Sequence, residues 1–176
     1  MKSLYSFIVR PLNERYDNTR NIDGKSLIIN TSIENHRFVS KKAVVVSTPA
    51  AYKTDINVGD ELYVHHNIFR RWYDMKGRER NSSTFFKDDL YFVSPEQIYM
   101  YNLKSHLNYC FVKPLKNQDL LRNRKEQPNV GIVKYTNNSL EAIGVLPGAL
   151  VTFTPDSEFE FIIDGERLYC MKSNDI

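Results

Sequence analysis

The chain is poor in cysteine. Of its 176 residues only Cys110 and Cys170 are cysteines, and neither belongs to a CxxC pair. This supply is too small for a disulfide framework or for a zinc site built on cysteine alone. Both cysteines fall in segments rich in β-branched and aromatic residues, which favours two buried thiols over a disulfide or a reactive thiol.

Long apolar runs and an excess of one charge are also missing. No stretch approaches the roughly 20 apolar residues of a membrane span. The first residues, MKSLYSFIVRP, lack the apolar core and the small-residue cleavage site of a signal peptide. The 24 basic and 21 acidic residues give a formal charge of +3, and the basic pairs are scattered among acids. We therefore expect a soluble, cytoplasmic protein with no membrane partner, and a nucleic-acid partner is not expected.

The sequence offers no catalytic or metal-binding set. No nucleophile, base and orienting acid occur together, and the acidic pairs Asp88-Asp89 and Glu158/Glu160 fall in turns or alternate along strand-like segments. His65 and His66 are adjacent, and because successive strand residues point to opposite faces, both would not reach one metal ion. We predict a protein that is not an enzyme and needs no metal or cofactor.

What the chain does have is a repeat of three blocks in the same order. VRPL at Val9 returns as VKPL at Val112, NVGDELYV at Asn57 returns as LPGALVTF at Leu146, and DLYFVSPEQI at Asp89 returns as RLYCMKSNDI at Arg167. The spacing between matched residues falls from 103 to 89 and then to 78, so the second copy lacks 14 and then 11 residues between blocks. Such deletions are typical of a duplicated domain with trimmed loops. We predict two units, residues 1–103 and 107–176.

Short runs of β-branched and aromatic residues dominate both copies, and no window of a dozen residues has a 3.6-residue apolar period, so an all-β fold is predicted. In the first copy, strands are expected at 5–10, 43–47, 61–66, 68–73, 84–86, 90–93 and 97–101. In the second copy they are expected at 109–113, 130–135, 150–154, 159–163 and 167–171. Residues 74–80 and 163–166 have the composition of hairpin turns.

The connection between the copies is short. Residues 97–115 have strand character on both sides of a polar break at 104–106. Strands joined so closely are expected to pair antiparallel, which would put the last strand of the first copy beside the first strand of the second copy.

Several motifs carry a family resemblance. FVKPL at Phe111, GVLPGALVTF at Gly144 and IDGERLYCMKSNDI at Ile163 in the second copy are matched in the first by FIVRPL at Phe7, INVGDELYVHHN at Ile56 and DDLYFVSPEQI at Asp88. Together they resemble the GroES-type co-chaperonins, the ten-kilodalton chaperonin family, over most of the chain. The resemblance implies two tandem GroES-like, partly open Greek-key β-barrels.

The same resemblance implies a function. Members of the family form homo-oligomeric rings that cap a GroEL-type chaperonin cage and assist ATP-dependent folding, so unfolded proteins are their indirect partners. Duplicated members are known in plastids, and viral members diverge strongly. A viral source, and with it a location in the host cytoplasm, is therefore among the expectations.

The family contacts its chaperonin through a mobile loop with a short apolar triplet. The matching segment here is NIDGKSLIINTS, in which Gly24 is followed by Leu27, Ile28 and Ile29, so the resemblance implies that these four residues form the contact. Burying three aliphatic side chains yields about 5–8 kcal/mol before ordering costs. Ordering a loop takes back about 2–5 kcal/mol, so one loop binds weakly and a ring gains by avidity.

Two alternatives remain for these segments. SLIINTS is also a good strand, and it could form a structured hairpin with RFVSKKAVVV. In the second copy the corresponding place holds KNQDLLRNRKEQPN, where Leu120 and Leu121 are either a second contact or locally packed residues.

Two features depart from the family pattern. The place of the family's roof hairpin holds only TPAAYKTD, and the insertion at residues 65–86 has no counterpart in the second copy. Arg70, Arg71, Trp72 and Tyr73 in that insertion would suit a nucleic-acid surface, although a hairpin whose aromatics pack on the barrel or on a neighbour is favoured. The alternative function is a non-enzymatic structural or virion assembly module built on the same barrel.

Overall fold

The structure is a computed structural model that describes residues 2–22, 25–28, 32–33, 35–116 and 126–176. Over these residues the chain is mostly β, with antiparallel sheets, none of which closes into a barrel. It divides into two compact units, Met1–Asn102 and Leu103–Ile176. The all-β prediction is therefore confirmed, and the sheets are open.

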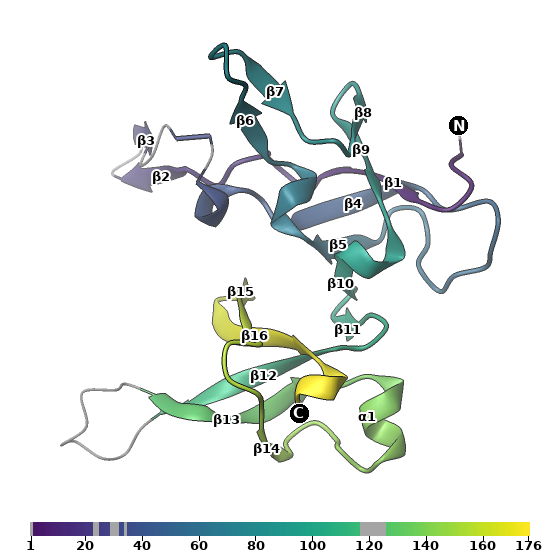
Figure 1. Cartoon of the computed structure of the whole chain (residues 1–176), viewed down its shortest axis with the longest axis vertical. Helices are drawn as coiled ribbons and strands as arrows, with labels where there is room; N and C mark the ends of the chain where they lie inside the picture. The colour runs from purple at the N-terminus through teal and green to yellow at the C-terminus, as the bar shows by residue number, and fades with distance from the viewer. Residues whose placement is uncertain (1, 23–24, 29–31, 34, 117–125) are drawn as a thin grey trace. The chain divides into compact units, whose positions relative to one another are not determined.

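The first unit supplies six strands of a seven-stranded sheet (Figure 1). Its strand order is β11-β10-β5-β4-β1-β9-β8. The strands are β1 (Phe7–Pro11), β4 (Lys42–Ser47), β5 (Glu61–Val64), β8 (Phe85–Lys87), β9 (Leu90–Val93), β10 (Ile98–Tyr101) and the short β11 (Lys104–Ser105), which directly follows the unit boundary. Two separate hairpins complete the unit: β2 (Thr19–Ile22) with β3 (Lys25–Ile28), and β6 (Arg71–Tyr73) with β7 (Glu79–Asn81).

The sheet of the first unit forms because apolar residues alternate along its strands. In β4, Ala43, Val45 and Ser47 are buried while the residues between them are at least partly exposed, as expected for a strand with one face on a core. The core on that face gathers buried residues from every part of the unit: Phe7, Val9, Tyr16, Val39, Ala43, Val45, Ile56, Leu62, Val64, Ile68, Phe69, Tyr91, Val93 and Ile98.

The second unit has a five-stranded sheet in the order β14-β13-β12-β16-β15. Its strands are β12 (Tyr109–Lys116), β13 (Glu126–Tyr135), β14 (Leu150–Thr152), β15 (Phe159–Ile163) and β16 (Glu166–Lys172), and one short helix, α1 (Asn138–Ala142), follows β13. Cys110 and Val112 on β12 pack with Leu140 of α1 and with Met171 of β16. Both cysteines are buried and neither forms a disulfide, so the prediction of two buried thiols is confirmed.

The matched sequence blocks occupy matched strands. The order β5-β4-β1-β9-β8 in the first unit corresponds to β14-β13-β12-β16-β15 in the second. The registers also agree. Val9 pairs with Val45 and Tyr91 in the first unit, while Val112 pairs with Val133 and Tyr169 in the second. Even a turn is repeated, because the N–H groups of Gly59 and Gly148 donate to Val45 and Val133 over the same 2.8 Å.

Some predicted local features are wrong. β10 does not pair with β12, because both edges of β12 are already taken by β13 and β16. The helix α1 was missed, since five residues are too few to show a helical period. The expected strand over 68–73 is confined to Arg71–Tyr73, because residues 66–68 form a 3₁₀ turn.

Candidate functional site

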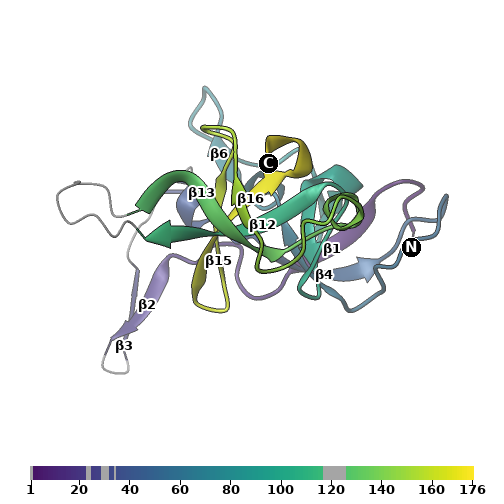
Figure 2. The same ribbon diagram turned by 90° about the horizontal axis from the view of Figure 1, so that it is seen from below.

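The segment between β1 and β4 carries an arm, which we define as residues 17–33. Its described part is the β2–β3 hairpin, in which Thr19 pairs with Ile28 and Arg20 with Leu27. Figures 1 and 2 both show this hairpin extending away from the seven-stranded sheet. Leu27 is 52% exposed and Ile28 is 64% exposed. Two neighbouring aliphatic side chains are thus presented to solvent.

The structure places only part of the predicted contact set. Leu27 and Ile28 lie on β3, whereas Gly24 and Ile29 are outside the described residues. Leu120 and Leu121 are also outside them. A hairpin does form in this segment, but its partner strand is Thr19–Ile22 instead of RFVSKKAVVV. The second half of RFVSKKAVVV lies in β4, which pairs with β1 and β5.

Backbone hydrogen bonds fix the point at which the arm leaves the unit. The N–H of Asp17 donates to the Phe38 carbonyl oxygen over 2.7 Å, and the N–H of Ser40 donates to the Arg15 carbonyl oxygen over 2.9 Å. Between them Tyr16 and Val39 form an antiparallel bridge. The residues that enter and leave the arm are therefore held side by side.

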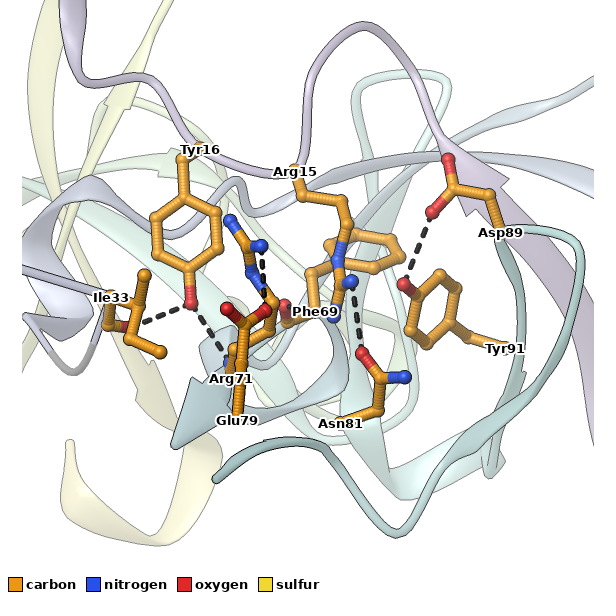
Figure 3. Close-up of polar contacts among 9 residues, drawn as sticks. All are labelled: Arg15, Tyr16, Ile33, Phe69, Arg71, Glu79, Asn81, Asp89 and Tyr91. Carbon is orange, nitrogen blue, oxygen red and sulfur yellow. Dashed lines mark hydrogen bonds and ion pairs between the residues drawn. The ribbon is translucent and has the colours of Figure 1, made fainter. Parts of the chain in front are cut away.

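Tyr16 is the central side chain at this place. Its residue is only 7% exposed, and its ring belongs to the first core. The hydroxyl donates to the Ile33 carbonyl oxygen over 2.6 Å and accepts from the Arg71 backbone N–H over 2.8 Å (Figure 3). One hydroxyl thus joins the start of the arm, its end and strand β6.

Arg15 makes a second link beside it. Its guanidinium donates to the Asn81 side-chain oxygen over 3.0 Å and to the Phe69 carbonyl oxygen over 3.1 Å. The same group lies 5.2 Å from the centre of the Tyr91 ring, a cation–π geometry. Figure 3 shows Arg15 between Tyr16 and Tyr91. We call Arg15, Tyr16, Arg71, Glu79, Asn81 and Tyr91 the base cluster.

The other side chains of the base cluster are paired with a partner or packed against a ring. Arg71 forms an ion pair with Glu79 at 2.7 Å and lies 4.9 Å from the centre of the Tyr16 ring. The Tyr91 hydroxyl donates to Asp89 over 3.1 Å. Burial raises the pKa of Tyr91 above its ordinary value, so this hydroxyl stays protonated at neutral pH. The arrangement is suited to holding a segment in place.

The insertion is attached partly as predicted, because its aromatic residues Phe69 and Phe85 pack on the core of the first unit. The hairpin tip is present, since the Asp74 N–H donates to the Arg78 carbonyl oxygen over 2.9 Å. However, Trp72 and Tyr73 are exposed, and Arg71 and Asn81 make the contacts with the base of the arm. Arg78 and Arg80 both pair with Asp74, which reduces the positive charge available to a nucleic acid.

The histidines form a small cluster of their own. Because β5 ends at Val64, His65 and His66 do not alternate across a strand, and their rings stack with centres 4.3 Å apart. Their predicted placement on opposite faces is therefore wrong. Burial, reinforced by neighbouring histidines and cations, lowers the pKa of His66 to about 4. Among the described residues no three His, Cys, Asp or Glu side chains are placed to hold a metal ion.

No helix in the described ranges is both long and apolar enough to cross a lipid bilayer. No protein-family model matches the chain, and no curated protein matches it either.

Proposed function

We propose that this protein is a co-chaperonin-like component of a homo-oligomeric ring that caps a chaperonin and assists ATP-dependent protein folding. In this proposal the arm contacts the chaperonin through Leu27 and Ile28, together with Gly24 and Ile29 of the same segment. The observation that carries it is an arm with two exposed aliphatic side chains and a base fixed by hydrogen bonds. The resemblance of the sequence blocks to GroES-type proteins supplies the partner.

The energetics of such an arm fit a reversible cap. Each aliphatic side chain contributes about 1.5–3 kcal/mol when it is fully removed from water, and Leu27 and Ile28 still have half or more of their surface to bury. Ordering and association costs consume much of this gain. A single arm therefore binds weakly, and several arms on one ring bind together through avidity.

The architecture gives separate support. Two units with the same strand order and register fit the tandem, partly open GroES-like barrels that the proposal assumes. The first unit carries the arm between its first and second matched strands, β1 and β4, which is where the family resemblance places the mobile loop.

The direct test is the substitution Ile28→Asp. A carboxylate at this position cannot enter an apolar groove without a large desolvation cost, so we expect binding to a chaperonin, measured with nucleotide by co-sedimentation, to fall by at least about 100-fold. Circular dichroism and the thermal midpoint should stay nearly unchanged, because Ile28 is exposed.

Val58→Asp is the matched control for this test. Val58 has the same 64% exposure as Ile28 but lies outside the arm. It should bind like the unaltered protein. The proposal is wrong if the unaltered protein does not bind a chaperonin, or if both substitutions reduce binding equally.

One observation favours the alternative of a structural or virion assembly module. The described part of the arm is a hydrogen-bonded hairpin, and an ordered hairpin suits a permanent contact with another copy of the chain. In that case native mass measurement would show a large assembly of this chain alone, no complex with a chaperonin, and a segment 16–35 that resists proteolysis. A chaperonin complex and rapid cleavage in this segment would contradict the alternative.

A further inference from the structure

The inserted hairpin has no counterpart in the second copy, and it meets the chain where the arm begins and ends. Residues 65–86 lie far from the arm in the sequence, yet β6 and β7 supply Arg71 and Asn81 to the base cluster. The segment that follows β7 is also fixed, because the hydroxyl groups of Ser82 and Thr84 donate to the Ile68 carbonyl oxygen over 2.6 and 2.9 Å. The hairpin is thus tied to the unit at both of its ends.

The Tyr16 hydroxyl is the joint between the hairpin and the arm. A tyrosine hydroxyl has one proton to donate, and here it goes to Ile33 at the end of the arm. The lone pairs accept the Arg71 N–H from β6. Because Tyr16 directly precedes the arm and packs in the core, a single side chain fixes both ends of the arm against the hairpin.

In the second unit, side chains of the sheet itself hold the chain where it returns to the sheet. Tyr169, which occupies the register position of Tyr91, donates to Glu126 over 2.8 Å. Glu126 is the first residue of β13, where the chain re-enters the sheet, and it also pairs with Arg167. In the first unit Tyr91 bonds to Asp89 instead, and the tie to the returning chain is made by Tyr16 and the hairpin.

We propose that the β6–β7 hairpin is a brace for the arm. Through Tyr16 and Arg15 it holds the two ends of the arm together and limits the directions in which Leu27 and Ile28 are presented. The role in partner binding rests on the proposed function, but bracing is a property of the isolated chain. Tyr16, Arg15 and Asn81 act as positioning residues.

The brace is tested by limited trypsin proteolysis of the isolated chain with Tyr16→Phe. This change keeps the ring in the core but leaves the Ile33 carbonyl oxygen and the Arg71 N–H without their partner. Opening of the arm should then become easier, and cleavage after Arg20 and Lys25, followed by mass spectrometry, should be about tenfold faster. Tyr52→Phe is the matched control, because it also removes a tyrosine hydroxyl that donates to a backbone carbonyl oxygen, that of Tyr5 over 3.1 Å, but lies outside the base cluster; its cleavage rate should match that of the unaltered chain.

A second variant keeps the test decisive if Tyr16→Phe does not fold. Asn81→Ala removes the exposed side-chain acceptor of Arg15 and should accelerate cleavage at the same two bonds by about threefold. Equal cleavage rates in the folded variants and the unaltered chain would overturn the brace. Faster cleavage in a chain that binds no chaperonin would leave the brace standing and overturn only the proposed function.

With a chaperonin that does bind, Tyr16→Phe should weaken binding several-fold, since a less fixed arm loses more freedom on binding.

Discussion

A glycine in one unit stands where the other has an alanine. Gly131 pairs with Pro114, and Ala43 pairs with Pro11 at the matched position. A Cβ atom added at Gly131 would collide with the Val112 side chain and lie 2.7 Å from the Lys113 carbonyl oxygen. Strands β12 and β13 therefore approach each other more closely than an alanine allows.

Gly131→Ala should accordingly destabilise the second unit by about 1–3 kcal/mol, since relief of the contact requires a shift of backbone atoms. The measurement is urea unfolding followed by the reactivity of Cys110 and Cys170, which are buried in this unit. Lys134→Ala, an exposed change on the same strand, is the comparison. A urea midpoint for Gly131→Ala equal to that of Lys134→Ala would show that β12 and β13 can move apart without a loss of stability.

At the scale of elements, the hairpin β6–β7 depends on one carboxylate. Asp74 accepts hydrogen bonds from the N–H groups of Lys76 and Arg78, both over 2.9 Å, and from the Arg80 side chain over 3.1 Å. These hydrogen bonds, led by the one from Arg78, lower the pKa of Asp74. The turn is thus closed by local contacts within the hairpin itself.

Replacing this carboxylate tests how far the turn depends on it. Asp74→Ala should raise amide hydrogen exchange across residues 71–81 by about threefold to tenfold, because the turn loses its acceptor. Exchange in β12 and β13 should not change. Lys76→Ala retains the carboxylate and serves as the control. Unchanged exchange in Asp74→Ala would mean that the strand pairing alone closes the hairpin.

Elements with strong local signals were predicted well from the sequence. The bounds of β9 and β15, Leu90–Val93 and Phe159–Ile163, are those expected, because turn residues and alternating apolar residues mark them. The alternative of a structured hairpin was right in that β3 does form one, but it named RFVSKKAVVV as the partner strand. Asp23-Gly24 in the sequence is a hairpin signal that would have indicated Thr19–Ile22 as the partner strand.

The sequence contains no comparable signal for the base cluster. Tyr16 and Arg71 are 55 residues apart, and the groups that Tyr16 contacts are a backbone N–H and a backbone carbonyl, which any residue type supplies. Leu27 and Ile28 were identified from the family resemblance, whereas Tyr16 and Arg15 could be found only from the contacts in the structure.

At the scale of the whole molecule, the two units repeat one sheet but carry different natural probes. The single tryptophan, Trp72, lies in the first unit, and both cysteines lie in the second. The second unit is the smaller one and, among the described residues, has fewer buried apolar side chains. Because burial per residue falls with domain size, it is expected to be the less stable of the two.

Unfolding in urea should therefore show two transitions. Thiol reactivity should appear at a lower urea concentration than the change in Trp72 fluorescence, because each probe reports its own unit. The difference should vanish in Gly59→Val, which strains the first unit at a backbone φ of +93°. Coincident transitions in the unaltered protein would show that the two units unfold as one.

Joining two repeats of one sheet in a single chain also has an arithmetical consequence for assembly. Any closed ring of whole chains contains an even number of units, whatever its diameter. A partner ring with an odd number of docking grooves then cannot be matched unit for unit. In that case each chain would dock through its single arm, so that grooves would be matched by whole chains and not by units.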